Sequence, residues 1–109
     1  MNELTAIETV LLAALSDRPR YGYELVQRMA ELTDGGVQVR PGNLYRVLHR
    51  LMERGMIRET QTAEGAEEDE RRRYFGATAL GRRVAAAELA MYARVLKRAP
   101  ALKEVLSDA

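Results

Sequence analysis

The clearest chemical signal in this chain is a set of arginines within residues 40–57. Arg46, Arg50 and Arg54 recur every four residues, and helical spacing places them with Asn43 on one side of a helix. Arginine can bind guanine or a phosphate, and asparagine can bind adenine, so this face is typical of a helix that lies in a nucleic-acid groove. An ordinary solvated helix surface explains the arginine face equally well. The apolar residues of the stretch recur on a different side of the same helix: Leu44, Val47, Leu48, Leu51 and Met52.

Both ends of this stretch carry residues that begin and end helices. Pro41 has no N–H to lose in a first turn, and Gly55 can adopt the left-handed conformation that follows a last turn. These signals predict a helix over residues 41–54. The first turns of such a helix enter a major groove, so Asn43 and Arg46 are the strongest candidates for contact with bases. A phosphate contact explains Arg46 equally well, and a capping or turn role explains Asn43 equally well.

The net charge of +1 hides an uneven distribution of charge. Residues 40–58 contain five arginines and one glutamate, a local balance of +4. Residues 64–70 contain five acids and no base, and Arg71, Arg72 and Arg73 follow directly. A local basic patch displaces counterions from DNA even where the total charge is near zero, so the sum does not exclude a nucleic-acid partner.

Composition disfavours several classes of function. A length of 109 residues predicts one domain with a modest core, which dimerisation would help to stabilise. Without cysteine there is neither a disulfide nor a thiolate metal site, and His49 is the single histidine, so we expect no metal and no cofactor. The chain has no glycine-rich phosphate loop and no nucleophile motif, which argues against an enzyme. No apolar run is long enough to cross a bilayer, and no signal-peptide pattern is present, so we expect no membrane association.

Hydrophobic periodicity predicts the remaining elements. Asn2 or Thr5 can cap the first helix, and Thr78 can cap the last one. Residues 37–39 are too short for an independent strand, although they could pair as a short edge piece. The expected order is helices over residues 4–15, 21–33 and 41–54, strands over 57–62 and 71–77 joined by an acidic connection, and a helix over 79–98.

This order is that of a winged helix-turn-helix, so the expected fold is mainly α with a small β-hairpin (α+β) and a long C-terminal helix. Residues 1–78 are expected to form the DNA-binding domain and residues 79–109 a dimerisation helix, together as one structural unit. The last helix has more apolar surface than a small domain can cover, which predicts a homodimer. Its expected interface consists of Leu80, Val84, Leu89, Met91, Tyr92, Val95 and Leu96.

Met91 and Tyr92 allow a second interpretation. Methionine surfaces accommodate varied ligands and pockets form between helices, so the two side chains could line an effector pocket at the dimer seam. Plain dimer core is the stronger of the two interpretations.

Several short motifs lie between about residues 11 and 81. They are LLAAL at 11–15, YGYEL at 21–25, PGNLY at 41–45, Leu48, Leu51, GMI at 55–57, RYF at 73–75, Thr78 and Gly81. In order and spacing these motifs resemble those of the PadR family of transcriptional regulators. Together they are specific, although none is so alone.

The resemblance implies a homodimeric, cytoplasmic, DNA-binding protein, usually a repressor relieved by a small molecule. Its shorter members dimerise through the single helix after the wing. Three features depart from the family pattern. Arg40 stands where a capping serine is common, so either Asn43 takes over part of that role or Arg40 holds a phosphate. Ala77 replaces a larger aliphatic residue, and the wing tip is acidic. The absence of tryptophan also excludes the tryptophan-lined drug pocket of some relatives.

The expected DNA contacts combine this resemblance with the residue types. Tyr45 could place its hydroxyl on a phosphate or could simply pack in the core, and Tyr21 has the same two alternatives. Strand alternation allows only part of the run at 71–73 to face DNA, and the remainder is expected to pair with Glu59 or with the acids of the wing tip. The candidate set is Arg20, Tyr21, Arg40, Gly42, Asn43, Tyr45, Arg46, Arg50, Arg71, Arg72 and Arg73.

Two functions follow as alternatives. The first is a homodimeric regulator, a repressor by expectation, that binds a pseudo-palindromic operator in double-stranded DNA and can be released by a small-molecule effector. The second is a winged-helix module that binds a partner protein through its wing and long helix, which the acidic wing tip slightly favours.

Overall fold

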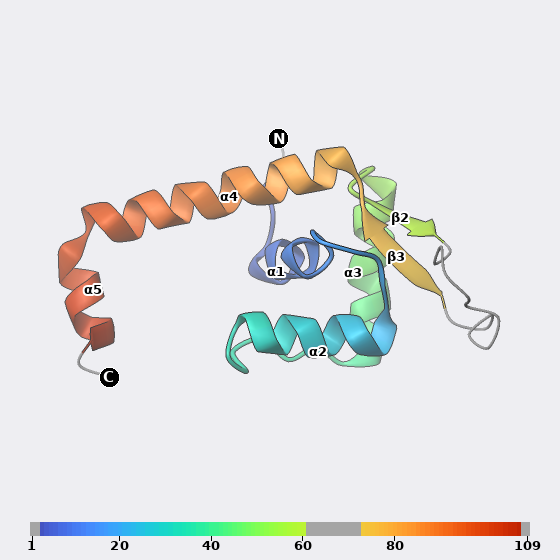
Figure 1. Cartoon of the computed structure of the whole chain (residues 1–109), viewed down its shortest axis with the longest axis horizontal. Coiled ribbons are helices and arrows are strands. Elements are labelled where there is room, and N and C mark those ends of the chain that lie inside the picture. Colours follow the sequence, from blue (N-terminus) through green and yellow to red (C-terminus); the bar gives the residue numbers. More distant parts are fainter. Residues whose placement is uncertain (1–2, 61–72, 108–109) are drawn as a thin grey trace.

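The computed structural model describes residues 3–60 and 73–107 of the chain. Three helices and a small sheet form one end of the molecule, which we call the head. A long helix extends away from the head (Figure 1). Predicted helices are confirmed to within a few residues at each end. The elements are α1 (Ala6–Ala14), β1 (Arg20–Tyr21), α2 (Gly22–Leu32), α3 (Pro41–Glu53), β2 (Ile57–Thr60), β3 (Tyr74–Ala77), α4 (Ala79–Arg98) and α5 (Pro100–Ser107).

A capping box begins α1. The Thr5 hydroxyl accepts a hydrogen bond from the backbone N–H of Glu8 at 3.2 Å, and the Glu8 carboxylate accepts one from the Thr5 N–H at 2.9 Å. Two otherwise unsatisfied N–H groups are thereby paired, which explains why the helix begins here. Of the two predicted caps, Thr5 is the one the structure uses.

The sheet has three antiparallel strands in the order β1-β3-β2, so β3 is central. Ile57 pairs with Ala77 and Thr60 with Tyr74, which confirms the predicted hairpin. The added strand β1 pairs with the other edge of β3 through Arg20 and Tyr21. Residues 37–39 adopt no strand, as their short length predicted, and the alternative of a short edge piece is not realised.

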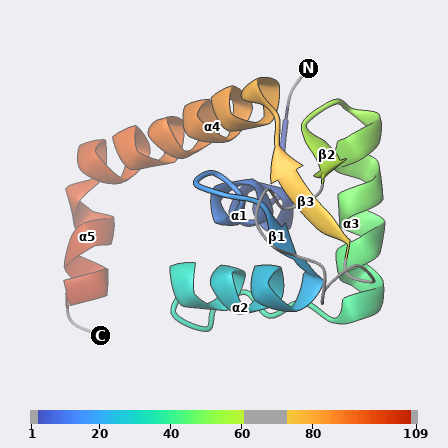
Figure 2. The ribbon, with the colours of Figure 1, turned by 45° about the vertical axis from the view of Figure 1, so that its right-hand side comes forward.

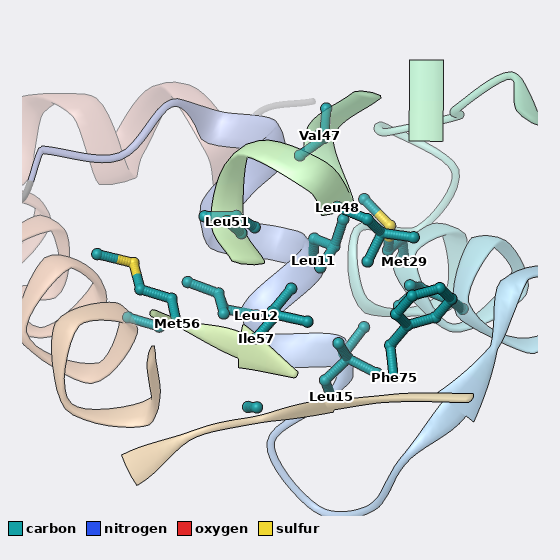
Figure 3. Packing of buried hydrophobic residues seen from close by; sticks show 14 of the residues in the cluster. Leu11, Leu12, Leu15, Met29, Val47, Leu48, Leu51, Met56, Ile57 and Phe75 are labelled. Atoms are coloured by element: carbon teal, nitrogen blue, oxygen red, sulfur yellow. The ribbon is translucent and has the colours of Figure 1, made fainter. Parts of the chain in front are cut away.

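α1 lies in the centre of the head, between α2 and α4 in Figure 1 and again in the rotated view of Figure 2. Its apolar side chains meet those of α3 and of the sheet in one core (Figure 3). This packing holds α3 by its apolar face and leaves its other face at the surface. The largest fully buried side chains are Phe75, Leu11, Leu12, Leu15, Leu25, Met29, Leu44, Leu48, Leu51, Met56 and Val47.

Two close contacts fix where α3 ends and α4 begins. Gly55 adopts φ +76°, and the N–H of Met56 donates to the Leu51 carbonyl at 2.9 Å, as in a Schellman motif. The predicted cap Thr78 accepts from the Gly81 N–H and donates to the Gly55 carbonyl at 2.7 Å. Gly81 packs directly on Met56, where a Cβ would lie 3.0 Å from the carbonyl carbon and closer still to its oxygen.

α4 is buried only over its first half. Gly81, Val84 and Ala85 pack in the head, whereas the outer half is exposed and α5 turns away at Pro100 with no buried residue (Figure 1). Because the head and the base of α4 share one core, the two parts expected from the sequence are joined by packing as well as by the chain. Among the described residues, no helix is long and apolar enough to cross a membrane.

Candidate nucleic-acid interface

The start of α3 presents an uncovered cationic surface. Arg40 is the N-cap residue, and its side chain makes no capping hydrogen bond, as its chemistry predicts. Arg40 and Arg46 are exposed, and neither guanidinium has an ion-pair partner among the described residues. Gly42 lies between them, and a Cβ added there would meet no atom within 4 Å. We call Arg40, Gly42, Asn43 and Arg46 the reading surface.

Asn43 is half-buried within the reading surface. Its side chain makes no hydrogen bond to any described residue, and the N-cap position of α3 is occupied by Arg40. The capping interpretation of Asn43 therefore gains no support, and its amide remains available to an external partner. Asn43 and Arg46 lie one turn apart, which is the spacing at which adjacent side chains of a helix can address neighbouring base pairs.

Arg50 is tied to the inside of the protein rather than to the reading surface. Its Nε lies 3.6 Å from the buried carboxylate of Glu8, and Arg54 approaches the same carboxylate at 3.5 Å. Arg54 also donates to the Glu3 carbonyl at 3.1 Å. Sequence reasoning missed Glu8, because the link between α1 and α3 exists only in the folded chain. Arg50 is therefore a weaker candidate for DNA contact than Arg46.

Tyr45 packs at the edge of the core and is also partly exposed. Its ring packs edge-on against Phe75 with centroids 6.2 Å apart, yet 42% of the residue is exposed. Its hydroxyl lies over the start of α2, where a Cβ on Gly22 would be only 2.8 Å away. A side chain at position 22 would therefore push the Tyr45 hydroxyl away from the start of α2.

Arg73 lies at the base of the wing beside Tyr45. Its guanidinium forms two 2.9 Å hydrogen bonds with Glu59 on the neighbouring strand and lies 5.3 Å from the centre of the Phe75 ring and 6.0 Å from that of Tyr45. Hydrogen bonding to Arg73 holds the pKa of the Glu59 carboxyl below its usual value, and the same bonds raise the pKa of Arg73. The predicted pairing across the hairpin is confirmed for this residue, while Arg71, Arg72 and the acidic tip lie outside the described residues.

Arg20 requires a correction. We expected it to face the DNA backbone, but the residue is only 6% exposed. Its guanidinium donates to the Ala14 carbonyl at 2.5 Å and to Asp17 at 2.7 Å, and this hydrogen bond holds the pKa of the Asp17 carboxyl below its usual value. The side chain therefore closes the turn after α1, and we remove it from the candidate set. Tyr21 supplies the N-cap of α2 and packs edge-on against Tyr74 at 5.5 Å, which matches its packing alternative.

Tyr23 is one of the apolar residues of α2, and the structure places it at the surface. It is 66% exposed, near Tyr45 at the junction of α2 and α3. Leu25 and Met29, on the same helix, are fully buried as expected. The sequence signal that could have separated Tyr23 from them is its hydroxyl, since a tyrosine at the edge of an apolar stripe often keeps that group in water.

The expected dimer residues divide into two groups. Val84 is buried in the head and Leu80 packs against the same core, so these two stabilise the single chain. The others lie on the outer half of α4 with 37–54% of each residue exposed. This exposed group, which we call the outer stripe, consists of Leu89, Met91, Tyr92, Val95 and Leu96.

The expected effector pair is only half supported by the shape of this surface. Met91 lines an open hollow of about 360 Å³ together with Arg94 and Val95, and Tyr92 does not line it. Hydrogen bonding to the Glu88 carboxylate raises the pKa of the Tyr92 hydroxyl. Among the described residues, no cluster of His, Asp or Glu could hold a metal ion.

These features define a winged helix-turn-helix in which α3, the second helix of the motif, carries a cationic surface. A comparison with protein families matches residues 11–87 to the transcriptional regulator PadR-like family. The chain therefore belongs to the PadR-like family, whose members are DNA-binding regulators of transcription rather than enzymes.

Three proteins similar to this chain illustrate the range of sequence and fold similarity. An uncharacterized protein of Lysinibacillus sphaericus is 27% identical over 78 residues, which are 70% of this chain and 68% of that protein. A PadR family transcriptional regulator from Eggerthella lenta is 26% identical, with a TM-score of 0.64 over 90% of this chain and 81% of that one. A PadR family regulator from Clostridium difficile shares the fold at 17% identity, with a TM-score of 0.71 over 90% of this chain and 98% of the other.

Proposed function

We propose that this regulator acts as a homodimer that inserts the starts of two α3 helices into successive major grooves of a pseudo-palindromic operator. The observation that carries the proposal is the pair of uncovered guanidiniums, Arg40 and Arg46, around the open Gly42 position. A cationic helix start with room beside it suits close approach to a duplex. Repression follows as the proposed outcome, because a protein clasped across an operator excludes the transcription machinery from that site.

The outer stripe supports the dimer. It continues, one turn after another, the same side of α4 whose first half is buried by α1. Several adjacent apolar side chains are left in water in a single chain, and an equivalent stripe on a second copy would cover them with the same two-fold geometry. The two heads would then carry their reading surfaces one helical turn of DNA apart, about 34–36 Å.

Selection of bound sequences from random DNA by the purified protein tests the proposal. We expect an inverted repeat with fixed spacing. Arg46→Ala should then weaken binding to the selected site about tenfold or more, in line with the 1–3 kcal/mol that a two-point contact to a base contributes. Lys97→Ala removes the same charge from the tail and should leave binding within about twofold.

The form of the Arg46 effect decides its role. Equal weakening on the selected site and on random DNA would reduce Arg46 to a phosphate contact. Absence of any DNA binding at low salt would contradict the proposal and favour the protein-interaction module. For a true DNA contact, log K should fall by about 0.9 per log unit of salt for each phosphate neutralised.

The dimer has its own test. Val95→Glu places a charge in the outer stripe, whereas Ala90→Glu places the same charge on the opposite side of α4. Sedimentation should show that Val95→Glu dissociates the dimer and that Ala90→Glu does not. A wild-type protein that sediments as a monomer at micromolar concentration would overturn this part of the proposal.

We also propose release by a small molecule, the remaining part of the expected function. The hollow beside Met91 on α4 supports it, because a second copy placed over the outer stripe would partly enclose that space. Compounds that dissociate the selected DNA in a screen would support release, and Met91→Ala should then reduce their effect.

A further inference from the structure

A second hollow lies in the head, where the start of α2 meets the start of α3. Its volume is about 230 Å³, and it is more enclosed than the hollows along α4. Each of the two helices contributes three of its lining residues. They are Gly22, Tyr23 and Val26 from α2, and Pro41, Leu44 and Tyr45 from α3.

We propose that this hollow, here called the head cavity, binds a small neutral aromatic molecule and that its occupancy weakens DNA binding. The site differs from the expected effector position on α4, and its coupling to DNA rests on the proposed function. The charge, shape and position of the lining support this assignment.

The lining carries no charged side chain. An ionised ligand would lose its hydration without gaining a partner, so the cavity disfavours anions and cations. Its volume suits one ring or a fused pair of rings and is too small for a peptide helix, which needs a groove long enough for several turns. The occupant is therefore a compact neutral molecule rather than a protein segment.

Two tyrosine rings stand at the rim of the head cavity. Tyr23 and Tyr45 are 66% and 42% exposed, so both keep apolar ring surface that a ligand could cover. Aromatic rings gain from edge-to-face and offset contacts with each other, which favours an aromatic ligand over an aliphatic one. The Tyr23 hydroxyl accepts a hydrogen bond from Gln27 Nε2 at 3.0 Å, and its own proton can be donated to a ligand acceptor.

The head cavity and the reading surface both include residues from the start of α3. Pro41 and Tyr45 line the cavity. The residues that directly follow them, Gly42 and Arg46, belong to the reading surface. A molecule lodged against Tyr45 changes where its ring and hydroxyl lie, and so changes the surface that meets the DNA backbone. Because coupling between two binding sites is reciprocal, DNA should weaken ligand binding by the same factor.

Titration of the full chain with indole, followed by methyl NMR, tests the site. We expect saturable shifts at the methyl groups of Val26, Val39 and Leu44, with a Kd between about 10 µM and 1 mM for so small a ligand. Indole-3-carboxylate, which adds a charge, should bind at least tenfold more weakly. Shifts that do not saturate, or that centre on Met91, would overturn the proposal.

Two variants separate the cavity from general effects on folding. Val26→Phe fills the cavity and should abolish the indole shifts, while Tyr23→Ala removes only an exposed ring and should weaken indole binding several-fold. Leu32→Ala, at the exposed far end of α2, is the matched control and should leave binding unchanged. If Val26→Phe fails to fold, the Tyr23→Ala result decides, and unchanged binding there would contradict the assignment.

The effect of indole on DNA binding is measured separately from the binding of indole itself. Saturating indole should lower DNA affinity at least threefold for the wild type and leave Val26→Phe unaffected. Indole binding with unchanged DNA affinity would overturn the coupling. A protein that binds no DNA would refute the proposed function, whereas the NMR titration would still decide whether the head cavity binds indole.

Discussion

Arg73 and Glu59 face each other across the β2–β3 hairpin with both hydrogen bonds at 2.9 Å, beside the Tyr45 ring of α3. Arg73 is thus already paired with an internal anion at the place where a DNA phosphate would approach. Roughly half of each side chain is exposed, so the pair contributes little to stability. Its larger effect is on charge, because Glu59 offsets a cation that the wing would otherwise offer to DNA.

Glu59→Gln should therefore strengthen DNA binding. We expect a three- to tenfold gain at low salt, and a salt slope steeper by about one phosphate contact. Titration of labelled DNA at several salt concentrations measures both quantities. Glu31→Gln is the control, since Glu31 forms a similar exposed pair with Arg28 on α2. Weaker binding by Glu59→Gln would show instead that the carboxylate positions Arg73 for DNA.

Gly42→Ala should separate stability from DNA binding. The added Cβ meets nothing within 4 Å, and alanine limits the unfolded chain more than glycine, so the free energy of unfolding should rise by about 0.5–1 kcal/mol. The same methyl group lies on the reading surface and should weaken DNA binding several-fold. Thermal unfolding and DNA titration of one sample give the two results. Unchanged DNA affinity would place the duplex away from this turn.

Gly81→Ala should have the opposite effect on stability. A Cβ there overlaps the Met56 backbone, which cannot move aside as a flexible side chain would. We expect a loss of about 2–4 kcal/mol, the upper range for overpacking. Urea unfolding measures it, with Gly42→Ala as the glycine-to-alanine control. A loss below 0.5 kcal/mol would show that α4 shifts freely on the head.

Glu8→Gln should loosen the attachment of α3 to α1. The substitution keeps the size of the side chain but removes the charge that faces Arg50 and Arg54. Because Glu8 is only 4% exposed, we expect unfolding to become easier by about 1–3 kcal/mol. Urea unfolding checks this, and Glu31→Gln, at an exposed pair, should change stability by less than about 0.5 kcal/mol. Equal effects of the two variants would contradict the role given to Glu8.

Asp17 provides a prediction for pH. Its bond to Arg20 lowers its pKa in the folded state, so it contributes stability above the ordinary value near 3.8 and loses it as pH falls through the lowered value. The difference in urea midpoint between wild type and Asp17→Asn should be constant above about pH 5 and should shrink below pH 3.8. A difference that persists at pH 2 would mean that the carboxylate's charge is not its source.

Signals within the sequence of α3 itself were sufficient to predict this helix. Pro41 and Gly55 mark its ends through backbone properties of the residues themselves, and its apolar repeat predicts the buried face. The strand β1 was missed because two residues acquire strand geometry only by pairing with Tyr74 and Phe75, more than fifty positions later. No periodicity within residues 20–21 could reveal that partner.

The errors at individual side chains have the same origin. Arg20 has the residue type of a phosphate contact, and only the nearby Ala14 carbonyl and Asp17 reveal that it closes a turn. Val84 belongs to the apolar repeat of α4. The sequence does not show at which residue of that repeat burial by the head ends and exposure begins. Burial of this kind depends on contacts between segments, which a single chain's pattern does not contain.

In the proposed dimer, the length of α4 sets the distance between the two DNA-binding heads. At 1.5 Å per residue its 20 residues span about 30 Å, and only the first half is anchored in the head. In the proposed dimer, inserting one helical turn between Ala85 and Leu89 would move the two heads apart and rotate them little. Relatives that keep the same reading surface could then recognise half-sites at different separations by changing only the number of turns in this rod.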